Sequence, residues 1–505
     1  MSTYAAVDLG ASSGRVLVGR LAAGRLETVE ASRFANVPVR VPAGPSAADG
    51  ATQGGAAGTL HWDVLRLWRG VLEGLRVAGH EHGPVRSVGV DTWAVDHGLL
   101  DADGALLGNP VHYRDERTAG VPERVFERMP AAEHYALTGV QVQPFNTIFQ
   151  LGAAAGTAQL AAARRMLLVP DLLGYWLSGV EVTELTNAST TGLLDAATGG
   201  WSERALAALR DATGADVGAL LAPVVAPGRV LGPLRPDLAA ELGLGGAELV
   251  AVGSHDTASA VAAVPMDPSR AAYISSGTWS LVGVELDAPV LTEASRAANF
   301  TNELGVDGTV RYLRNVAGLW LLSESMRAWA AQGRPHHLAE LLEAAEHAPS
   351  LACVVDVDDP AFTPPGDMPS RIAAAARRTG QRPPPDEATT VRAILDSLAL
   401  GYRRAIRQAS ALSGRTVDVV HVVGGGSRNT LLCRLTADAT GLPVVAGPVE
   451  GTAMGNLLVQ AWATGALPGG LPAIREVVVA SSDLTRWEPT GSKAAWDAAE
   501  RILWP

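Results

Sequence analysis

The residues of this sequence best suited to chemistry are His255 and Asp256, which lie close to the midpoint of the chain. An apolar run at 249–252 precedes them, and the small residues of 257–264 follow. This pattern predicts a strand, a sharp turn and a helix. Turns at strand ends carry the chemistry of α/β proteins, so His255 and Asp256 are candidates for a role in it. Alternatively, Asp256 only caps the helix by accepting a bond from a backbone N–H.

A second acid, Asp8, ends an apolar strand at 4–9 and precedes a turn of small and hydroxyl residues at 10–14. The backbone N–H groups of such a turn can cradle a phosphate, and Asp8 could hold Mg²⁺ through water. An ordinary hairpin turn is the alternative. The strand–turn–strand pattern recurs at 271–284, around the hydroxyl turn 275–278. We therefore expect a duplicated fold in which the two turns grip a polyphosphate between domains.

Two more strand ends carry candidate ligand-binding residues. Three glycines at 424–426 follow an apolar strand at 417–423, and they would let the backbone approach a flat ligand such as adenine; a helix-entry loop is the alternative. The stretch after the strand at 85–90 contains Asp91, Trp93 and Asp96. Trp93 could pack on a sugar face while either acid binds hydroxyls. A buried tryptophan with one capping acid is an equally good interpretation.

The composition excludes several classes of protein. The chain has 505 residues, a length that predicts more than one domain. Its formal net charge of −12 disfavours nucleic-acid or anionic-membrane partners. Its two cysteines, Cys353 and Cys433, are far apart in sequence and predict a reduced protein rather than a disulfide framework. The only lysine is Lys493, so neither a P-loop nor a protein-kinase lysine can exist here.

The start of the chain lacks a signal-peptide pattern, and no apolar run approaches the length of a spanning helix. We therefore expect a cytoplasmic protein. The periodicity predicts a surface loop at 41–59, helices at 61–78, 147–166, 171–177, 389–412 and 450–462, and a hairpin at 99–107.

Together these features resemble the FGGY family of carbohydrate kinases over nearly the whole chain. The resemblance is carried by the stretches 7–15, 91–93, 144–147, 170–171, 186–188, 254–260, 275–280, 318–322, 423–426 and 429–432. It implies an α/β fold of two actin-like (ribonuclease-H-like) domains with an active-site cleft between them. Residues 1–250 would form the N-terminal domain, with the sugar-binding residues and the phosphate loop. Residues 251–505 would form the C-terminal domain, with the catalytic base and the adenine site.

The resemblance also implies roles for single residues. Asp256 would be the general base, and Asp8 would position Mg²⁺. Substrate would be bound by Ala94, His255, Asp256, Thr257 and Asn315. ATP would be bound by Ala11, Ser12, Ser13, Gly14, Arg15, Thr278, Ser323 and Gly425. This chain departs from the family pattern at two residues. Ala94 replaces a glycine, which bears on the substrate preference, and Ser323 replaces a glutamine, which bears on one nucleotide contact.

The implied reaction transfers the γ-phosphoryl group of ATP to the 1-hydroxyl of a ketose. L-Rhamnulose is the expected acceptor, and fuculose, xylulose and ribulose are the alternatives. The expected partners are therefore a small sugar and ATP, without nucleic acid or membrane, in a monomer or homodimer. A reading from another class, an actin-like nucleotide-binding or scaffold protein, is disfavoured by the His255–Asp256 pair and by Trp93.

Overall fold

The computed structural model describes residues 1–42 and 58–504, so most of the predicted loop at 41–59 lies outside the described residues. The chain divides into two compact units. Unit 1 comprises Met1–Ala263, Leu286–Arg311 and Thr452–Ser481. Unit 2 comprises Val264–Glu285, Tyr312–Gly451 and Ser482–Pro505.

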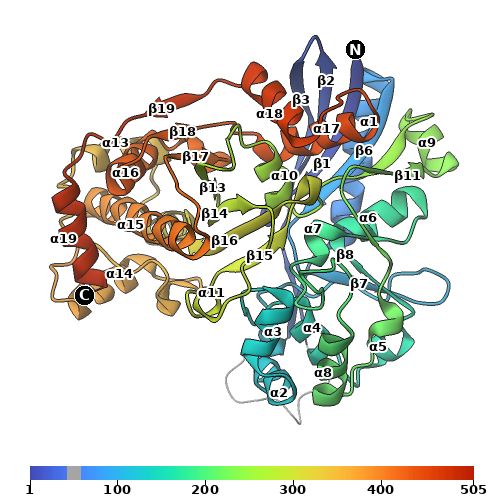
Figure 1. Cartoon of the computed structure of the whole chain (residues 1–505), viewed down its shortest axis with the longest axis horizontal. Coiled ribbons are helices and arrows are strands. Elements are labelled where there is room, and N and C mark those ends of the chain that lie inside the picture. The colour runs from blue at the N-terminus through green and yellow to red at the C-terminus, as the bar shows by residue number, and fades with distance from the viewer. Residues whose placement is uncertain (43–57, 505) are drawn as a thin grey trace. The chain divides into compact units, whose positions relative to one another are not determined.

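Unit 1 is built on a mixed sheet whose strand order is β3-β2-β1-β6-β12-β11. The labels β3, β2, β1, β6 and β11 mark strands of this sheet in Figure 1. The neighbours β3, β2 and β1 are antiparallel, β1, β6 and β12 run parallel, and β11 closes the sheet antiparallel to β12. The strands are β1 (Ser2–Leu9), β2 (Ser13–Ala22), β3 (Arg25–Ala35), β6 (Val85–Thr92), β11 (Arg229–Pro233) and β12 (Glu248–Ala251).

The second sheet has seven strands in the order β15-β16-β14-β13-β17-β18-β19, and the strands other than β15 (Thr301–Leu304) lie wholly or mostly in unit 2. Here β13 is antiparallel to β14, β13, β17 and β18 run parallel, and β19 is antiparallel to β18. The strands are β13 (Ala271–Ser276), β14 (Trp279–Leu286), β16 (Val310–Ala317), β17 (Val419–Val423), β18 (Val444–Ala446) and β19 (Thr485–Trp487). The predicted duplication is therefore present as two sheets in which six strands follow the same order, and β15 extends the second sheet beyond β16.

Helices cover both faces of the unit 1 sheet, because the central strand β1 is apolar on both sides. Ala5, Val7 and Leu9 pack in one core cluster with α1 (Val64–His82) and α6 (Val169–Ser178). Tyr4 and Ala6 face the opposite cluster, which contains α17 (Gly451–Ala463) and α18 (Gly470–Ser481). Since side chains alternate along a strand, Asp8 lies on the α17 face at the end of β1.

One of the predicted helices differs in the structure. The predicted helix at 147–166 is wrong: the segment forms α4 (Thr147–Ala153), α5 (Ala158–Ala162) and the strand β8 (Arg165–Leu168). Its alanine content is typical of a helix, but Gly156 adopts a φ of 75° between the two helices. The Thr157 side chain then caps α5 by accepting from the backbone N–H of Leu160. Along the described ranges, no helix is both long and apolar enough to cross a membrane.

The other elements complete the two units. Unit 1 also contains β4 (Val39–Val41), β5 (Thr59–His61), β7 (His97–Leu100), α2 (Val121–Arg128), α3 (Ala131–Thr138), β9 (Thr183–Glu184), α7 (Leu185–Ala188), α8 (Glu203–Thr213), β10 (Val224–Val225), α9 (Pro236–Leu242), α10 (Asp256–Ala262), α11 (Glu293–Ala297) and β15 (Thr301–Leu304). Unit 2 also contains α12 (Trp320–Ala331), α13 (Leu338–His347), α14 (Met368–Arg378), α15 (Glu387–Ser413), α16 (Thr430–Thr440) and α19 (Lys493–Leu503).

Candidate active site

Three acids of unit 1 gather at one edge of its sheet, because β1, β6 and β12 run parallel and end side by side. Asp8 and Asp91 are register partners at the ends of β1 and β6. Asp91 is fully buried, and its pKa is raised well above the usual range by burial and by the negative charges of Asp8 and Asp256. The turn after β12, which carries Asp256, joins this edge through a bond of 2.9 Å from the Thr92 backbone N–H to the Ser254 carbonyl.

The predicted phosphate turn is ordered around an ion pair between Asp8 and Arg15. Arg15 donates from Nε and Nη2 to the same Asp8 oxygen, at 2.9 and 2.7 Å. Asn36, directly after β3, stabilises the turn by donating from its side-chain amide to the Gly10 carbonyl at 2.9 Å. Of the five predicted ATP-binding residues of this turn, Ala11 and Ser12 are exposed, Ser13 and Arg15 are half-buried, and Gly14 is buried.

Asp256 is the first residue of α10, and the capping interpretation of it holds in part. Its Oδ1 accepts from the backbone N–H of Thr257 at 2.6 Å, so it does help to cap the helix. Its side chain nevertheless keeps 32% of its surface exposed, which leaves it reachable by a substrate. Burial raises the pKa of Asp256, against the opposing effect of the neighbouring His255.

His255 is held between Asp256 and a buried ion pair. Its Nε2 lies 3.4 Å from Asp256 Oδ1, and its Nδ1 lies 3.2 Å from Glu303 Oε2. Arg311 Nη1 lies 2.9 Å from that same Glu303 oxygen. Burial alone would raise the pKa of Glu303, but the charges of Arg311 and His255 outweigh it and lower the pKa.

Sequence reasoning missed this pair. The available signal was weak, because the acid lies in the mostly polar strand β15 and the arginine in β16, which has a second arginine and an asparagine. Only the burial of both side chains reveals a pair, since such residues are rarely buried unless they are paired.

The stretch after β6 forms an aromatic cluster anchored by Asp96. Trp62 and Trp93 lie with ring centroids 4.0 Å apart. Asp96 Oδ2 accepts from both indole N–H groups, at 2.5 and 3.0 Å, and from the Tyr113 backbone N–H at 3.2 Å, while Oδ1 accepts from Gln150 at 2.8 Å. Burial raises the pKa of Asp96 to about 6. The buried tryptophan with an anchoring acid is thus the arrangement observed, and the donors around Asp96 occupy both of its oxygens.

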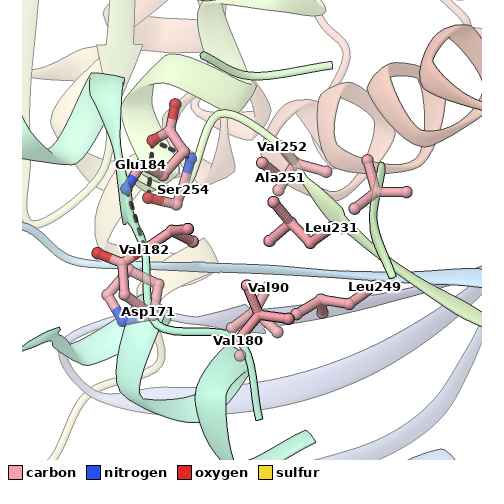
Figure 2. Close-up of a pocket in the computed structure, with 13 residues that line it drawn as sticks. Val90, Asp171, Val180, Val182, Glu184, Leu231, Leu249, Ala251, Val252 and Ser254 are labelled. Carbon is pink, nitrogen blue, oxygen red and sulfur yellow. Dashed lines mark hydrogen bonds between the residues drawn. The ribbon is translucent and has the colours of Figure 1, made fainter. Parts of the chain in front are cut away.

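A pocket with about 370 Å³ of empty space, part of it open to solvent, adjoins the turn that precedes Asp256. Its walls are mostly valine, leucine and alanine side chains, with Asp171, Glu184 and Ser254 as the polar contributors (Figure 2). Burial raises the pKa of both Asp171 and Glu184, and the Glu184 charge raises that of Asp171 further. This largely apolar lining is poorly suited to a sugar.

In unit 2, the glycine loop after β17 lies against the hydroxyl turn after β13. A Cβ at Gly426 would lie 2.0 Å from the Ser276 Oγ, and Gly424 adopts a φ of 82°. The glycines are therefore required by this close approach and by the backbone conformation. Gly425, between them, is exposed and remains available to a ligand.

The other predicted residues of unit 2 lie around the same turn. The backbone N–H of Trp320, at the start of α12, donates to the Thr278 carbonyl at 3.1 Å. Thr278 and Ser323 are exposed, while Asn315 is half-buried in β16. Within unit 1, the structure brings Asp8, the 11–15 turn and residues 255–257 to one edge of the sheet, while Ala94 is half-buried two residues after β6. Within unit 2, it brings the Thr278, Ser323 and Gly425 segments around one turn. A cleft between the units stays a prediction.

Comparison with known proteins agrees with this architecture. Residues 47–263 match the N-terminal domain and residues 272–464 the C-terminal domain of the FGGY family of carbohydrate kinases. A rhamnulokinase from Bacteroides thetaiotaomicron is 41% identical over 98% of this chain and 97% of its own length. A rhamnulokinase from Bacillus subtilis is 38% identical over 90% and 89%.

Solved structures show the same fold at low sequence identity. A gluconate kinase from Lactobacillus acidophilus superposes with a TM-score of 0.76 at 15% identity, covering 99% of this chain and 96% of the other. A Plasmodium falciparum glycerol kinase with ADP gives a TM-score of 0.72 at 14% identity, covering 100% and 99%. Both domain matches and the curated relatives lead to one conclusion: the chain belongs to the FGGY family of carbohydrate kinases.

Proposed function

We propose that this chain phosphorylates L-rhamnulose at its 1-hydroxyl with ATP, giving L-rhamnulose 1-phosphate for the breakdown of L-rhamnose. The observation that supports it is the match to relatives named rhamnulokinase, at 38–41% identity over nine-tenths or more of this chain. As a member of a carbohydrate kinase family, the chain takes a sugar and ATP as substrates. That the sugar is L-rhamnulose is the part of this statement that we propose.

Asp256 is the proposed general base. A carboxylate of raised pKa is a better proton acceptor than an ordinary one, and burial raises the pKa of Asp256. In the step, the O–H bond of the sugar 1-hydroxyl breaks and its proton goes to Asp256. The freed oxygen forms a bond to the γ-phosphorus, while the bond from that phosphorus to the ADP oxygen breaks. His255 and Thr257, on either side of the base, and Asn315 would hold the sugar.

The residues around Asp8 fit a magnesium ion carried by the nucleotide. No set of three or more histidine, cysteine, aspartate or glutamate side chains that could hold a metal occurs in the described part of the chain. Mg²⁺ usually binds one or two carboxylates together with waters and substrate phosphates, and Asp8, beside the buried and orphaned Oδ1 of Asp91, supplies such a carboxylate. The ion would neutralise phosphate charge. Without it, backbone N–H donors and Arg15 would be the groups that balance this charge, because the only lysine of the chain is Lys493.

We propose Ala11, Ser12, Ser13, Gly14, Arg15, Thr278, Ser323 and Gly425 as the ATP-binding residues. The turn at 11–15 would cradle phosphates through its N–H groups, and the exposed Gly425 would admit the adenine ring. We also place the protein in a reducing, cytoplasmic setting, as a monomer or homodimer. Burial raises the pKa of Cys353 to about 11 and that of Cys433 to about 12, so both thiols are poor nucleophiles at neutral pH.

A panel of ketoses tests the substrate. Purified protein with Mg-ATP is assayed for ADP release and sugar phosphate on L-rhamnulose, L-fuculose, D-xylulose and L-ribulose. We expect the highest kcat/KM on L-rhamnulose. A higher value on another ketose would reassign the chain to a sibling activity, which Ala94 in place of glycine would then help to explain.

Asp256→Asn tests the base. The amide keeps the side-chain shape but cannot accept the proton, so we expect kcat to fall by roughly 10²–10⁴-fold. Binding of sugar and of ATP, measured by calorimetry, should stay within a few-fold. An Asp256→Asn enzyme with full turnover would show that another group takes the proton.

A further inference from the structure

Glu184 lies behind the turn that carries His255 and Asp256, and it makes an unusual number of hydrogen bonds. Its Oε2 accepts from the Ser254 backbone N–H at 3.0 Å and from the Ser254 hydroxyl at 2.8 Å. The same oxygen accepts from the Thr186 hydroxyl at 2.6 Å, and Oε1 accepts from the Thr186 backbone N–H at 3.0 Å. Figure 2 shows Glu184 and Ser254 joined at the end of the pocket.

A second link reaches the next residue of the turn. The Thr186 hydroxyl, which donates its proton to Glu184, accepts from the His255 backbone N–H at 3.3 Å. One carboxylate therefore controls two successive backbone positions, directly at Ser254 and through Thr186 at His255. These are the two residues immediately before Asp256, and they lie about 70 residues from Glu184 in sequence.

The chemistry of the site favours a carboxylate over any neutral side chain. Glu184 is 2% exposed. Burial raises its pKa, and the hydroxyl and backbone donors of Thr186 and Ser254 oppose this effect by stabilising the charge. Keeping an acid in such a place is costly unless its donors need it. An amide with its oxygen in place of Oε2 would bind the Ser254 and Thr186 donors without the negative charge that strengthens such bonds. Its NH₂, in place of Oε1, would face the Thr186 backbone N–H, which is itself a donor.

We propose that Glu184 is a positioning residue for phosphoryl transfer, which fixes the backbone of the turn and thereby the placement of Asp256. Asp256 has little freedom to compensate, because its own carboxylate is tied to the Thr257 N–H at 2.6 Å. A movement of the turn therefore moves the base. A misplacement of about 1 Å in a catalytic group can reduce the rate by about 10²-fold.

This inference rests on the proposed role of Asp256, so its test combines two readouts. The first is a double-mutant cycle on kcat with Glu184→Gln and Ser254→Ala, which weaken one link from its two ends. We expect Glu184→Gln to lower kcat by roughly 10–100-fold at a temperature where the protein is folded, with the KM for ATP within about threefold. The double variant should be little worse than Glu184→Gln alone, because the two changes weaken the same contact. Glu181→Gln, a partly exposed acid three residues earlier, is the matched control and should leave kcat unchanged.

The second readout needs no activity. Hydrogen–deuterium exchange of peptides covering 250–262 should accelerate in Glu184→Gln and, to a smaller extent, in Ser254→Ala, while peptides from β2 and β3 keep their wild-type rates. Unchanged exchange in 250–262 for both variants would overturn the positioning role, whatever the enzyme phosphorylates. Faster exchange with multiplicative effects on kcat would show that Glu184 only stabilises the fold, and it would also overturn the proposal. If the wild type phosphorylates no ketose, the proposed function fails, and the exchange rates alone decide whether Glu184 fixes the turn.

Discussion

The ion pair of Glu303 and Arg311 provides the sharpest test of how unit 1 supports His255. Both side chains are almost fully buried, and Arg311 Nη1 lies 2.9 Å from Glu303 Oε2. At that separation, two unit charges attract by about 6 kcal/mol with an effective dielectric constant of 20. Glu303→Gln removes the negative charge and leaves Arg311 buried without its counter-charge. The glutamine dipole recovers part of the lost attraction, so we expect the free energy of unfolding to fall by about 3–5 kcal/mol.

The assay is urea unfolding followed by tryptophan fluorescence, with a second variant that separates charge from shape. Glu303→Gln/Arg311→Gln removes both charges, so it should recover at least half of the stability lost in the single variant. The exposed pair of Glu293 and Arg296 is the matched control, and its double glutamine variant should leave stability nearly unchanged.

The pH dependence gives an independent check on the same pair. Because the folded pKa of Glu303 is lowered, its stabilisation is present above the ordinary glutamate pKa and is lost as the pH falls through the folded value. The stability gap between wild type and Glu303→Gln should therefore narrow on acidification. A loss below about 1 kcal/mol in the single variant at neutral pH, or a double variant less stable than the single, would refute the reasoning.

Two more perturbations test other parts of unit 1. Asp96 has its pKa raised to about 6 in the folded protein, so the wild type should lose about 3 kcal/mol of stability as the pH rises from about 4 to 6. Urea unfolding at several pH values across this range should show a smaller loss in Asp96→Asn. Equal slopes of unfolding free energy against pH in the two proteins would contradict this pKa. Gly455→Ala would place a Cβ 1.8 Å from the Ser259 carbonyl oxygen, so we expect a loss of at least about 1–3 kcal/mol in the free energy of unfolding, whereas Gly245→Ala, with open space around it, should be nearly neutral.

Local pattern was sufficient to predict the strands and turns that carry the candidate chemistry. The repeat of strand, turn and strand at 4–21 and 271–284 predicted two matching sheets, because each pattern spans only about twenty residues and depends on alternation and turn composition. The helix at 147–166 was wrong since an alanine-rich stretch indicates helix whether or not a glycine interrupts it. Asp91 and Asp96 could not be told apart from the sequence, because what distinguishes them is their partners. Asp96 meets two indoles and an amide, whereas Asp91 meets other acids.

The late position of α17 in the chain explains why so much of the site escaped prediction. This helix belongs to unit 1, although nearly two hundred residues separate it from α10. Asn456 donates to Asp91 at 2.6 Å, Gln460 donates to the Ala5 carbonyl on β1 at 3.0 Å, and Gly455 lets the helix pack closely against α10. One helix thus contacts all three elements that present an acid, and no two of those elements are neighbours in sequence. Such contacts join residues that are very far apart in sequence. The positions of the three acids therefore depend on the complete fold of unit 1 and cannot be predicted from residue spacing alone.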